Sequence, residues 1–231
     1  AHYAEAAVSF ADVEAALQAA SEAYRTWRLS SPITRANILH KAANILESRI
    51  PDVGRELTRE EGKTLKEGIG ETTRAVQILR YFAGEAQQPS GEHYPSANPL
   101  TLLYTTREPL GVTAIVTPWN FPIAIPAWKI APALAFGNTV VFKPASLTPL
   151  SAVRLVEALA EAGLPPGVLN LVTGSASAIG DPLLRDKRVV AISFTGSNET
   201  GAELRKLAAE RGAKLQLELG GKNPAIVLAD A

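Results

Sequence analysis

The chain has 231 residues, of which 46% are hydrophobic, so it can bury a full core, and disorder is excluded as its main state. Its 23 basic and 23 acidic residues cancel without a basic block or an acidic tail, which argues against nucleic acid or a membrane surface and favours a small molecule as partner. The absence of cysteine excludes disulfides and thiolate metal sites, and the three scattered histidines predict no metal site.

No stretch approaches the roughly 20 uninterrupted apolar residues of a membrane span, and the N-terminus lacks a signal-peptide pattern. We therefore expect a cytoplasmic protein. The chain starts at Ala1, contains no methionine, and ends at Ala231 directly after a predicted strand, so we expect that both ends are processed or truncated.

The first 85 residues are predicted to be helical. Apolar residues recur at helical spacing over residues 9–28, and Ser9 with Asp12 forms a capping pair at the start. Ser31-Pro32 predicts the start of a second helix that runs to about residue 51. Amphipathic patterns continue from there to residue 82.

Residues 86–108 are expected to hold a loop and a strand. Proline, glycine, serine and asparagine over 88–99 predict the loop, and residues 100–107 read as a strand of mixed polarity. From residue 112 the pattern changes to short, unbroken apolar runs, which are typical of strands buried on both faces of a parallel sheet. The predicted strands are 112–116, 139–142, 168–172, 189–194, 215–219 and 225–228.

Helical segments separate these strands. They are a proline-interrupted segment at 122–136 and helices at about 149–162, 175–184 and 198–211, of which the first helix starts at Thr148-Pro149 and stops at Gly163. Alternating strands and helices imply right-handed crossovers. The predicted fold class is therefore α/β, with a doubly wound, mostly parallel Rossmann-like sheet preceded by a helical N-terminal region.

Ligands of open parallel sheets bind beyond the carboxyl ends of the strands. Here those ends carry an amide, an ammonium, several hydroxyls and a carboxylate, which together predict a site. The segments are Thr117-Pro118-Trp119-Asn120, Lys143-Pro144-Ala145-Ser146, Thr173-Gly174-Ser175, Thr195-Gly196-Ser197 and Glu218-Leu219-Gly220-Gly221-Lys222.

Thr195-Gly196-Ser197 follows a strand and opens a helix, so its backbone N–H groups suit a phosphate. An ordinary strand-to-helix turn with Ser197 as N-cap explains the same residues equally well. The G-x-G-x-x-G fingerprint, the Walker pattern and the G-x-S-x-G elbow are all absent, so the usual dinucleotide signature gives no support.

Three further side chains are candidates for chemistry. Lys143 is costly to bury without an anion, so it should lie at the rim and reach for one, although a solvated turn lysine is commoner. Asn120 offers an amide held between two prolines, as an oxyanion hole needs, unless it closes an Asx-turn. Glu218 enters a double glycine, where partial burial would suit a general base, but taken alone this position favours a carboxylate that caps the exposed glycine amides.

Four motifs together resemble the NAD(P)-dependent aldehyde dehydrogenase superfamily in order and spacing. They are Pro118-Trp119-Asn120-Phe121-Pro122, Lys143-Pro144-Ala145-Ser146, Phe194-Thr195-Gly196-Ser197 with Gly201, and Glu218-Leu219-Gly220-Gly221-Lys222. The resemblance covers essentially the whole chain and leans toward enzymes that act on semialdehydes of dicarboxylic acids. Members of that family bind coenzyme on a modified Rossmann sheet without the usual glycine fingerprint.

The resemblance implies that residues 1–231 form a coenzyme-binding domain for NADP or NAD, with a helical part at 1–85, a loop and strand at 86–108 and the sheet at 109–231. Asn120 would donate its side-chain amide to the oxyanion of a thiohemiacetal, and Glu218 would activate the water that hydrolyses the thioester. Lys129 resembles a lysine near the proton-relay path of that base.

By the same resemblance, Trp119 and Leu219 would line the nicotinamide side. Lys143 and Ser146 would meet the adenosine ribose and its 2′ substituent. Because NAD-restricted members commonly place a glutamate at the Ser146 position, we predict that this site accepts NADP.

Gly196 and Ser197 would contact the pyrophosphate, and Gly180 would pack near the adenine pocket. The whole implied coenzyme set is Thr117, Pro118, Trp119, Asn120, Lys143, Pro144, Ala145, Ser146, Gly180, Phe194, Thr195, Gly196, Ser197 and Leu219.

The chain departs from the family at its ends. The family's nucleophile is a cysteine a few dozen residues beyond the Glu218 motif, in a catalytic domain that this chain lacks, and the strands that precede the first helix are also missing. We therefore expect the chain alone to be inactive, and the complete enzyme to be a homo-oligomer that oxidises an aldehyde to a carboxylic acid.

Two other functions are open to the same residues. A non-catalytic nucleotide-binding module would use them for recognition alone. A conventional alcohol or hydroxy-acid dehydrogenase is disfavoured, because its glycine fingerprint is absent.

Overall fold

Four helices form the predicted helical region. The computed structural model of the chain describes residues 10–230 and places α1 at Phe10–Trp27, α2 at Pro32–Ser48, α3 at Ile50–Glu61 and α4 at Leu65–Glu85. Ser31 caps α2 as predicted, because its Oγ accepts the N–H of Thr34 at 3.1 Å. The predicted cap at Ser9 lies outside the described residues.

The second helix is shorter than predicted. It stops at Ser48, the chain turns at Arg49, and α3 begins at Ile50 with a proline in its first turn. Pro51 has no N–H for the helix that precedes it, but its fixed φ suits the first turn of a new one. The continuous run predicted to about residue 51 is therefore wrong.

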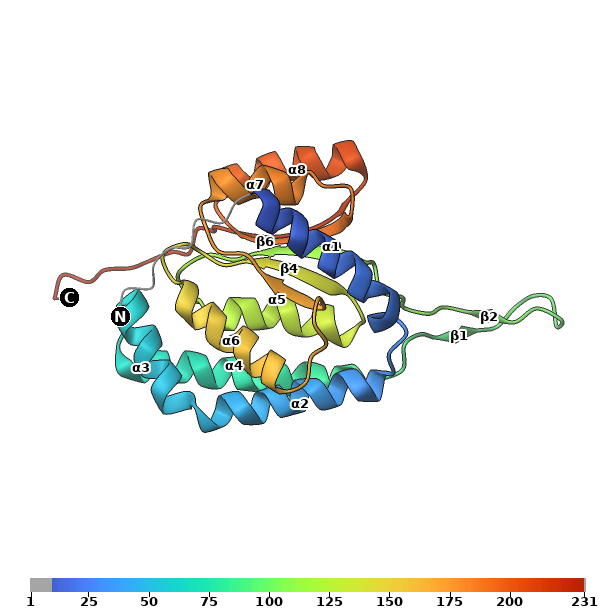
Figure 1. Cartoon of the computed structure of the whole chain (residues 1–231), viewed down its shortest axis with the longest axis horizontal. Helices are drawn as coiled ribbons and strands as arrows, with labels where there is room; N and C mark the ends of the chain where they lie inside the picture. Colours follow the sequence, from blue (N-terminus) through green and yellow to red (C-terminus); the bar gives the residue numbers. More distant parts are fainter. Residues whose placement is uncertain (1–9, 231) are drawn as a thin grey trace.

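Residues 86–108 form a hairpin arm. Strand β1 at His93–Tyr94 pairs antiparallel with β2 at Leu103–Tyr104, and the arm projects away from the body of the molecule (Figure 1). The strand predicted at 100–107 is shorter than expected, and β1 interrupts the loop predicted at 88–99. Within the described chain the arm pairs with no other strand, so its extended geometry rests on its own hydrogen bonds, which continue from Thr105 to Glu92 and from Arg107 to Ser90.

The remaining strands form one parallel sheet of order β5-β4-β3-β6-β7. Two outward progressions start from the centre, β3 to β4 to β5 and then β6 to β7, which confirms the doubly wound arrangement. The strands are β3 at Val112–Val116, β4 at Thr139–Lys143, β5 at Leu169–Leu171, β6 at Val189–Gly196 and β7 at Lys214–Leu219.

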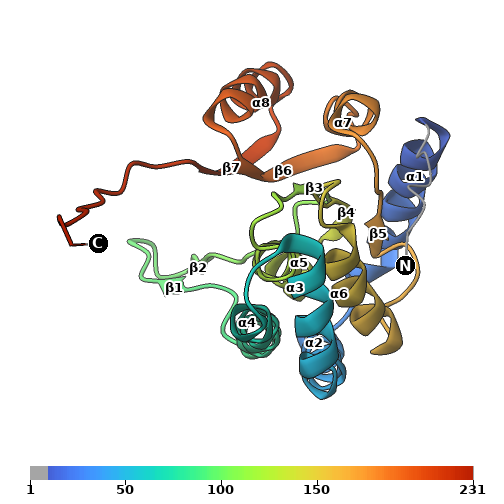
Figure 2. The same ribbon diagram turned by 90° about the vertical axis from the view of Figure 1, so that its left-hand side faces the viewer.

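One predicted strand is missing at the β7 edge, and the burial predicted for both faces fails for β7 itself. Residues 220–228 carry no strand, and Ile226, Val227 and Leu228 are exposed in a tail that runs away from the sheet (Figure 2). An apolar run becomes a strand only beside a pairing partner, and the described chain offers none there. Burial on both faces holds for β3 and β4, whereas β7 alternates between exposed and half-buried residues.

Helices cover both faces of the sheet. On one face α5 at Ala124–Ala135 and α6 at Pro149–Glu161 pack on the strands, with α2, α3 and α4 outside them. On the other face lie α1, α7 at Ala176–Leu184 and α8 at Asn198–Arg211 (Figure 2). Each face has its own apolar core, so Phe142 packs among the first group of helices and Val141 among the second.

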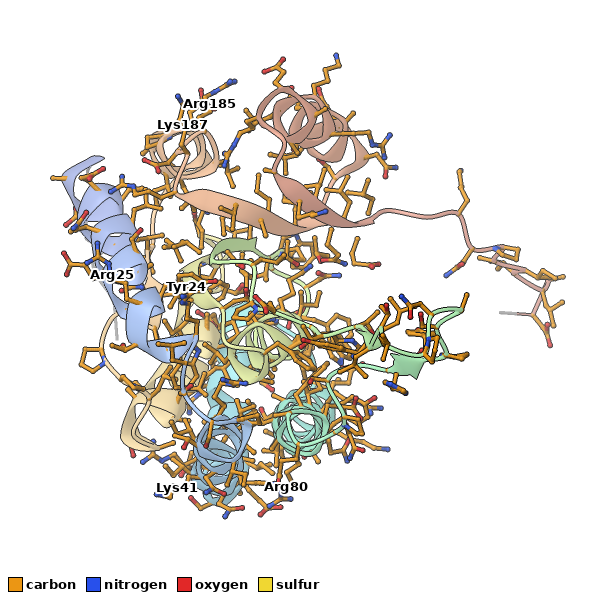
Figure 3. All side chains as sticks on the ribbon, turned by 90° about the vertical axis from the view of Figure 1, so that its right-hand side faces the viewer. Tyr24, Arg25, Lys41, Arg80, Arg185 and Lys187 are labelled. Carbon is orange, nitrogen blue, oxygen red and sulfur yellow. The ribbon has the colours of Figure 1, made fainter. Side chains whose placement is uncertain are left out.

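Charged side chains cover the outer helical layer, as Figure 3 shows for Lys41 on α2 and Arg80 on α4. Within residues 10–230, no helix combines the length and the apolarity needed to cross a bilayer. The same residues hold no group of three or more acidic or histidine side chains able to bind a metal ion.

Candidate active site

The loop after β3 carries Asn120. Its first residue, Thr117, continues the sheet by donating its N–H to the carbonyl of Lys143 at 3.3 Å. Asn120 is exposed, and its backbone carbonyl accepts the ammonium of Lys63 at 3.0 Å. The described residues provide no hydrogen bond to the Asn120 side-chain amide, so an Asx-turn does not engage it.

Lys129 enters the site from α5. Only 8% of this residue is exposed, and its Nζ donates to Ser193 Oγ and to Gln216 Oε1, both at 2.8 Å. Burial lowers the pKa of Lys129 from 10.5 to about 8, and the charge of Glu218 opposes part of that shift. The lysine therefore holds its proton weakly at neutral pH.

A hydrogen-bonded chain joins Lys129 to Glu218. Gln216 accepts from the lysine with Oε1 and donates to Glu218 Oε1 through Nε2 at 3.0 Å. Ser193 lies opposite Gln216 in the parallel register and donates to the same Oε1 at 2.5 Å. One amide thus fixes the relative positions of a cation and a carboxylate.

Glu218 is exposed, so the partial burial predicted for it is wrong. The reason is its place on β7, an edge strand whose outer face no element of the described chain covers. Its carboxylate opens into a cavity of about 630 Å³. The cavity is lined by Ile125, Trp128, Lys129, Pro132, Ser193, Thr195, Gln216, Glu218 and Leu219.

Lys143 is buried rather than at the rim, with 6% of the residue exposed. Its Nζ donates to the carbonyl of the neighbouring Pro144 at 3.1 Å, and burial lowers its pKa. A backbone carbonyl here satisfies part of the ammonium, which the expectation of a rim position did not allow for. Ser146 is exposed and donates to the carbonyl of Gly174 at 2.8 Å, so it ties the loops after β4 and β5 together.

The Thr195-Gly196-Ser197 segment lies where β6 ends and α8 begins. Ser197 is the N-cap of α8, and its Oγ accepts the N–H of Thr200 at 3.2 Å. A Cβ at Gly196 would come within 2.5 Å of the Phe194 ring, so a larger residue here would require that ring to shift. Gly180 lies within α7 with open space around its Cα, and the structure places no strand-end group against it.

Comparison with known proteins decides the family. Residues 2–231 match the sequence model of the aldehyde dehydrogenase family. The chain belongs to the aldehyde dehydrogenase family. The alpha-ketoglutaric semialdehyde dehydrogenase of Bacillus subtilis is 50% identical to it over 220 residues, which cover 95% of this chain and 45% of that protein. The succinate-semialdehyde dehydrogenase (NADP+) GabD of Escherichia coli is 43% identical over 95% of this chain and 46% of that protein.

Solved structures of aldehyde dehydrogenases agree with the sequence match. A betaine aldehyde dehydrogenase from Staphylococcus aureus in complex with NAD+ superposes with a TM-score of 0.91 at 38% identity, over 94% of this chain and 44% of that one. The parallel sheet and its helical layer are therefore those of this family. The chain spans about 45% of the length of the relatives that it matches.

Within this member of the aldehyde dehydrogenase family, the structure brings Lys129 and Glu218 into one network and leaves Asn120 exposed on a neighbouring loop. Sequence reasoning missed Ser193 and Gln216. Gln216 lies two residues before Glu218 and therefore on the same face of the strand, a signal that could have found it.

Sequence reasoning also missed Lys63 and Glu71, which contact the Asn120 loop from the helical region. Glu71 lies on the buried stripe of α4, among Gly68, Thr72 and Ala75. A carboxylate on an apolar stripe is costly unless it is paired, and this was the available signal.

Proposed function

We propose that this chain is the coenzyme-binding part of an enzyme that oxidises an aldehyde to a carboxylic acid with NADP or NAD, through a thioester on a cysteine outside residues 1–231. One observation carries the proposal. The carboxylate of Glu218, the weakly basic Lys129 and a cavity of about 630 Å³ occur together at the carboxyl edge of the sheet. A site of this composition suits proton transfer at a bound small molecule.

The strand-end donors fit a dinucleotide. The hydroxyl of Thr117 is buried and lacks a hydrogen-bond partner within the described chain. An ammonium has three donors, and the structure gives Lys143 Nζ one acceptor, Pro144 O. With Ser146 and the N-terminus of α8, these groups would hold ribose hydroxyls and phosphates. NAD(P)+, when bound, accepts the hydride that the oxidation releases.

Asn120 and Glu218 divide the chemistry of the acyl group between them. The exposed amide of Asn120 would donate to the oxyanion that forms when the thiol adds to the aldehyde. Glu218 would take a proton from the water that attacks the thioester. Gln216, bonded to Glu218 Oε1 at 3.0 Å, orients that carboxylate, and Lys129 behind it holds the Gln216 amide in place.

A semialdehyde with a distal carboxylate is the substrate class that we propose. Two of the relatives described above are named for such compounds. A hollow of about 400 Å³ beside the Asn120 loop is lined in part by Phe121, Trp128 and Arg74. Arg74 is exposed and makes no hydrogen bond or ion pair within the described residues, so its guanidinium can pair with a carboxylate.

Assembly and location are proposals as well. The hairpin arm exposes Leu100, Leu102, Leu103 and Tyr104, and apolar side chains of this kind are typical of surfaces that contact another chain. We propose that the complete enzyme is a cytoplasmic homo-oligomer. Mass measurement of the complete protein with and without residues 95–102 tests the role of the arm.

The activity is tested with the purified chain itself. We expect coenzyme binding but no aldehyde-dependent formation of NADPH or NADH and no esterase activity, because the chain contains no cysteine to serve as nucleophile. Reduced coenzyme produced by a rigorously purified chain would contradict this. Sequencing past Ala231 separates the alternative, since a non-catalytic binding module requires no cysteine in a second α/β domain.

A further inference from the structure

Glu71 of α4 is a buried carboxylate that caps a different helix. Its side chain is 2% exposed, and its Oε1 accepts the N–H groups of Ile123 at 3.0 Å and of Ala124 at 3.1 Å. These are the first free amides of α5, whose own N-cap residue, Ile123, provides no side-chain acceptor. A charge from 52 residues away in sequence thus satisfies the positive end of α5.

Lys63 connects this cap to the Asn120 loop. Its Nζ donates to Glu71 Oε2 at 2.7 Å and to the carbonyl of Asn120 at 3.0 Å. The same ammonium lies 4.1 Å from the centre of the Phe121 ring, a cation–π distance. Glu61 adds a second carboxylate at 3.0 Å.

These partners keep Lys63 charged. Burial acts to lower its pKa, but the hydrogen bond to Glu71 and the ion pair with Glu61 outweigh burial and raise the pKa of Lys63. The lysine is therefore a cation at neutral pH, the form that donates to the carbonyl of Asn120.

We propose that Lys63 and Glu71 are positioning residues that aim the side-chain amide of Asn120. This inference rests on the proposed role of Asn120 as the oxyanion donor. Lys63 fixes the backbone at Asn120, Glu71 fixes it three residues later at Ile123, and the two side chains are paired with each other. Two anchors restrain the backbone between them, which limits the positions from which the Asn120 side-chain amide can reach a bound substrate.

The test measures acylation in the complete enzyme, as the rate of the first burst of reduced coenzyme. Lys63→Met removes the ammonium but keeps an unbranched stem beside Phe121. We expect acylation to slow by about 10- to 100-fold, the range for misplacing an oxyanion donor, with the coenzyme Kd unchanged. Lys63→Arg retains a cation with several donors and should restore most of the rate.

A double-mutant cycle separates positioning from general loosening of the fold. In an Asn120→Ala background no amide is left to aim, so Lys63→Met should slow acylation by less than about 3-fold. The full loss in both backgrounds, or no loss in either, overturns the positioning role. If Asn120→Ala alone leaves acylation unchanged, the proposed function of Asn120 fails instead, whatever Lys63→Met does.

Glu60→Gln is the matched control. Glu60 caps α6 from α3 in the same way, accepting the N–H groups of Leu150 at 2.5 Å and Ser151 at 2.9 Å, but α6 follows a different loop. It should lower the Tm much as Glu71→Gln does, yet show no coupling to Asn120→Ala, whereas Glu71→Gln should be coupled. Equal coupling of both variants overturns the proposal. Should Lys63→Met fail to fold, Glu71→Gln, which keeps an oxygen acceptor, decides by the same cycle.

Discussion

The two strand pairs of the sheet differ in how they are covered, and their site residues differ accordingly. Strands β3 and β4 are buried by helices on both faces, and the loops that follow them carry Asn120 and Ser146. Strand β7 is covered on one face only, and β6 beside it ends in half-buried residues, so the less covered face carries Ser193, Gln216 and Glu218. We call these the buried pair and the open pair.

The difference indicates a division of labour. A loop that follows a strand of the buried pair is held by well-packed residues, which suits groups that must keep a fixed direction, such as an oxyanion donor. The open pair leaves a carboxylate in contact with water, which suits a group that must exchange protons. Substitutions on the open pair should therefore change chemistry with little change in stability.

The largest expected effect is that of Glu218→Gln on the open pair. Thioester hydrolysis in the complete enzyme should slow by about 10³-fold, within the range for loss of a general base, while hydride transfer stays near its original rate. Stopped-flow traces should show a burst of reduced coenzyme followed by slow turnover. The Tm should hardly change, since the side chain is exposed. A lost burst with normal hydrolysis would show that Glu218 has another role.

On the buried pair, Asn120→Ala should slow the acylation step by about 10²-fold, the typical loss for one oxyanion donor. Its backbone contact with Lys63 is retained, so the loop should stay in place. Single-turnover kinetics measure the step directly, with Asn120→Asp as a matched variant that keeps the shape but removes the donor. Unchanged acylation in both variants would contradict the assignment.

Lys129 lies between the two pairs and offers a stability test on the chain itself. Below pH 8 the lysine is protonated in both the folded and the unfolded state, and the difference between 10.5 and about 8 means that burying this charge costs about 3 kcal/mol. From pH 8 to 10.5 the native chain has released the proton and the unfolded chain still binds it, so stability rises with pH.

In Lys129→Met this rise of about 3 kcal/mol should be missing, because no group at that position titrates. Urea unfolding of both proteins from pH 7 to 10.5 gives the comparison. Lys206→Met, on the exposed side of α8, controls for the loss of one charge and should follow the wild-type curve. If the free energy of unfolding changes with pH in the same way for wild type and Lys129→Met, burial of the Lys129 charge does not lower stability.

Strands were predictable from sequence in both pairs, since β4 and β7 were each predicted to within one residue. An unbroken apolar run by itself indicates a buried strand, and β3 was predicted residue for residue. The residues at 225–228 have the same apolar pattern but no pairing partner within residues 10–230, so they form no strand. Local pattern predicts a strand only when the rest of the chain supplies a neighbour.

The site was predicted where its residues lie in short motifs and was missed where contacts are long-range. The sequence motifs named Lys129 and Glu218 as candidates but not Lys63 or Glu71, which contact the segment at 120–124 from more than 45 residues away. Lys143 was predicted at the rim because its alkyl stem and a backbone acceptor, which allow its burial, are not visible in sequence. The roles of all these residues remain predictions.

The smallest expected effect concerns coenzyme choice, at Ser146 after β4 of the buried pair. The wild-type hydroxyl is small and uncharged, so a 2′-phosphate should be accepted, and buried Lys143 three residues earlier supplies a cation with donors to spare. In Ser146→Glu a carboxylate would repel that phosphate and accept hydrogen bonds from the ribose hydroxyls of NAD. One such charge–charge interaction near the surface corresponds to about a tenfold shift in preference toward NAD.

Paired titrations of the complete enzyme with NADP and NAD measure the shift, and Ser146→Gln controls for side-chain size without charge. If wild type rejects NADP, or Ser146→Gln shifts preference as much as Ser146→Glu, then repulsion at residue 146 does not set coenzyme choice. The loop's tie to Gly174 is lost in both variants, so a change common to both measures that tie, and the difference between them measures the charge.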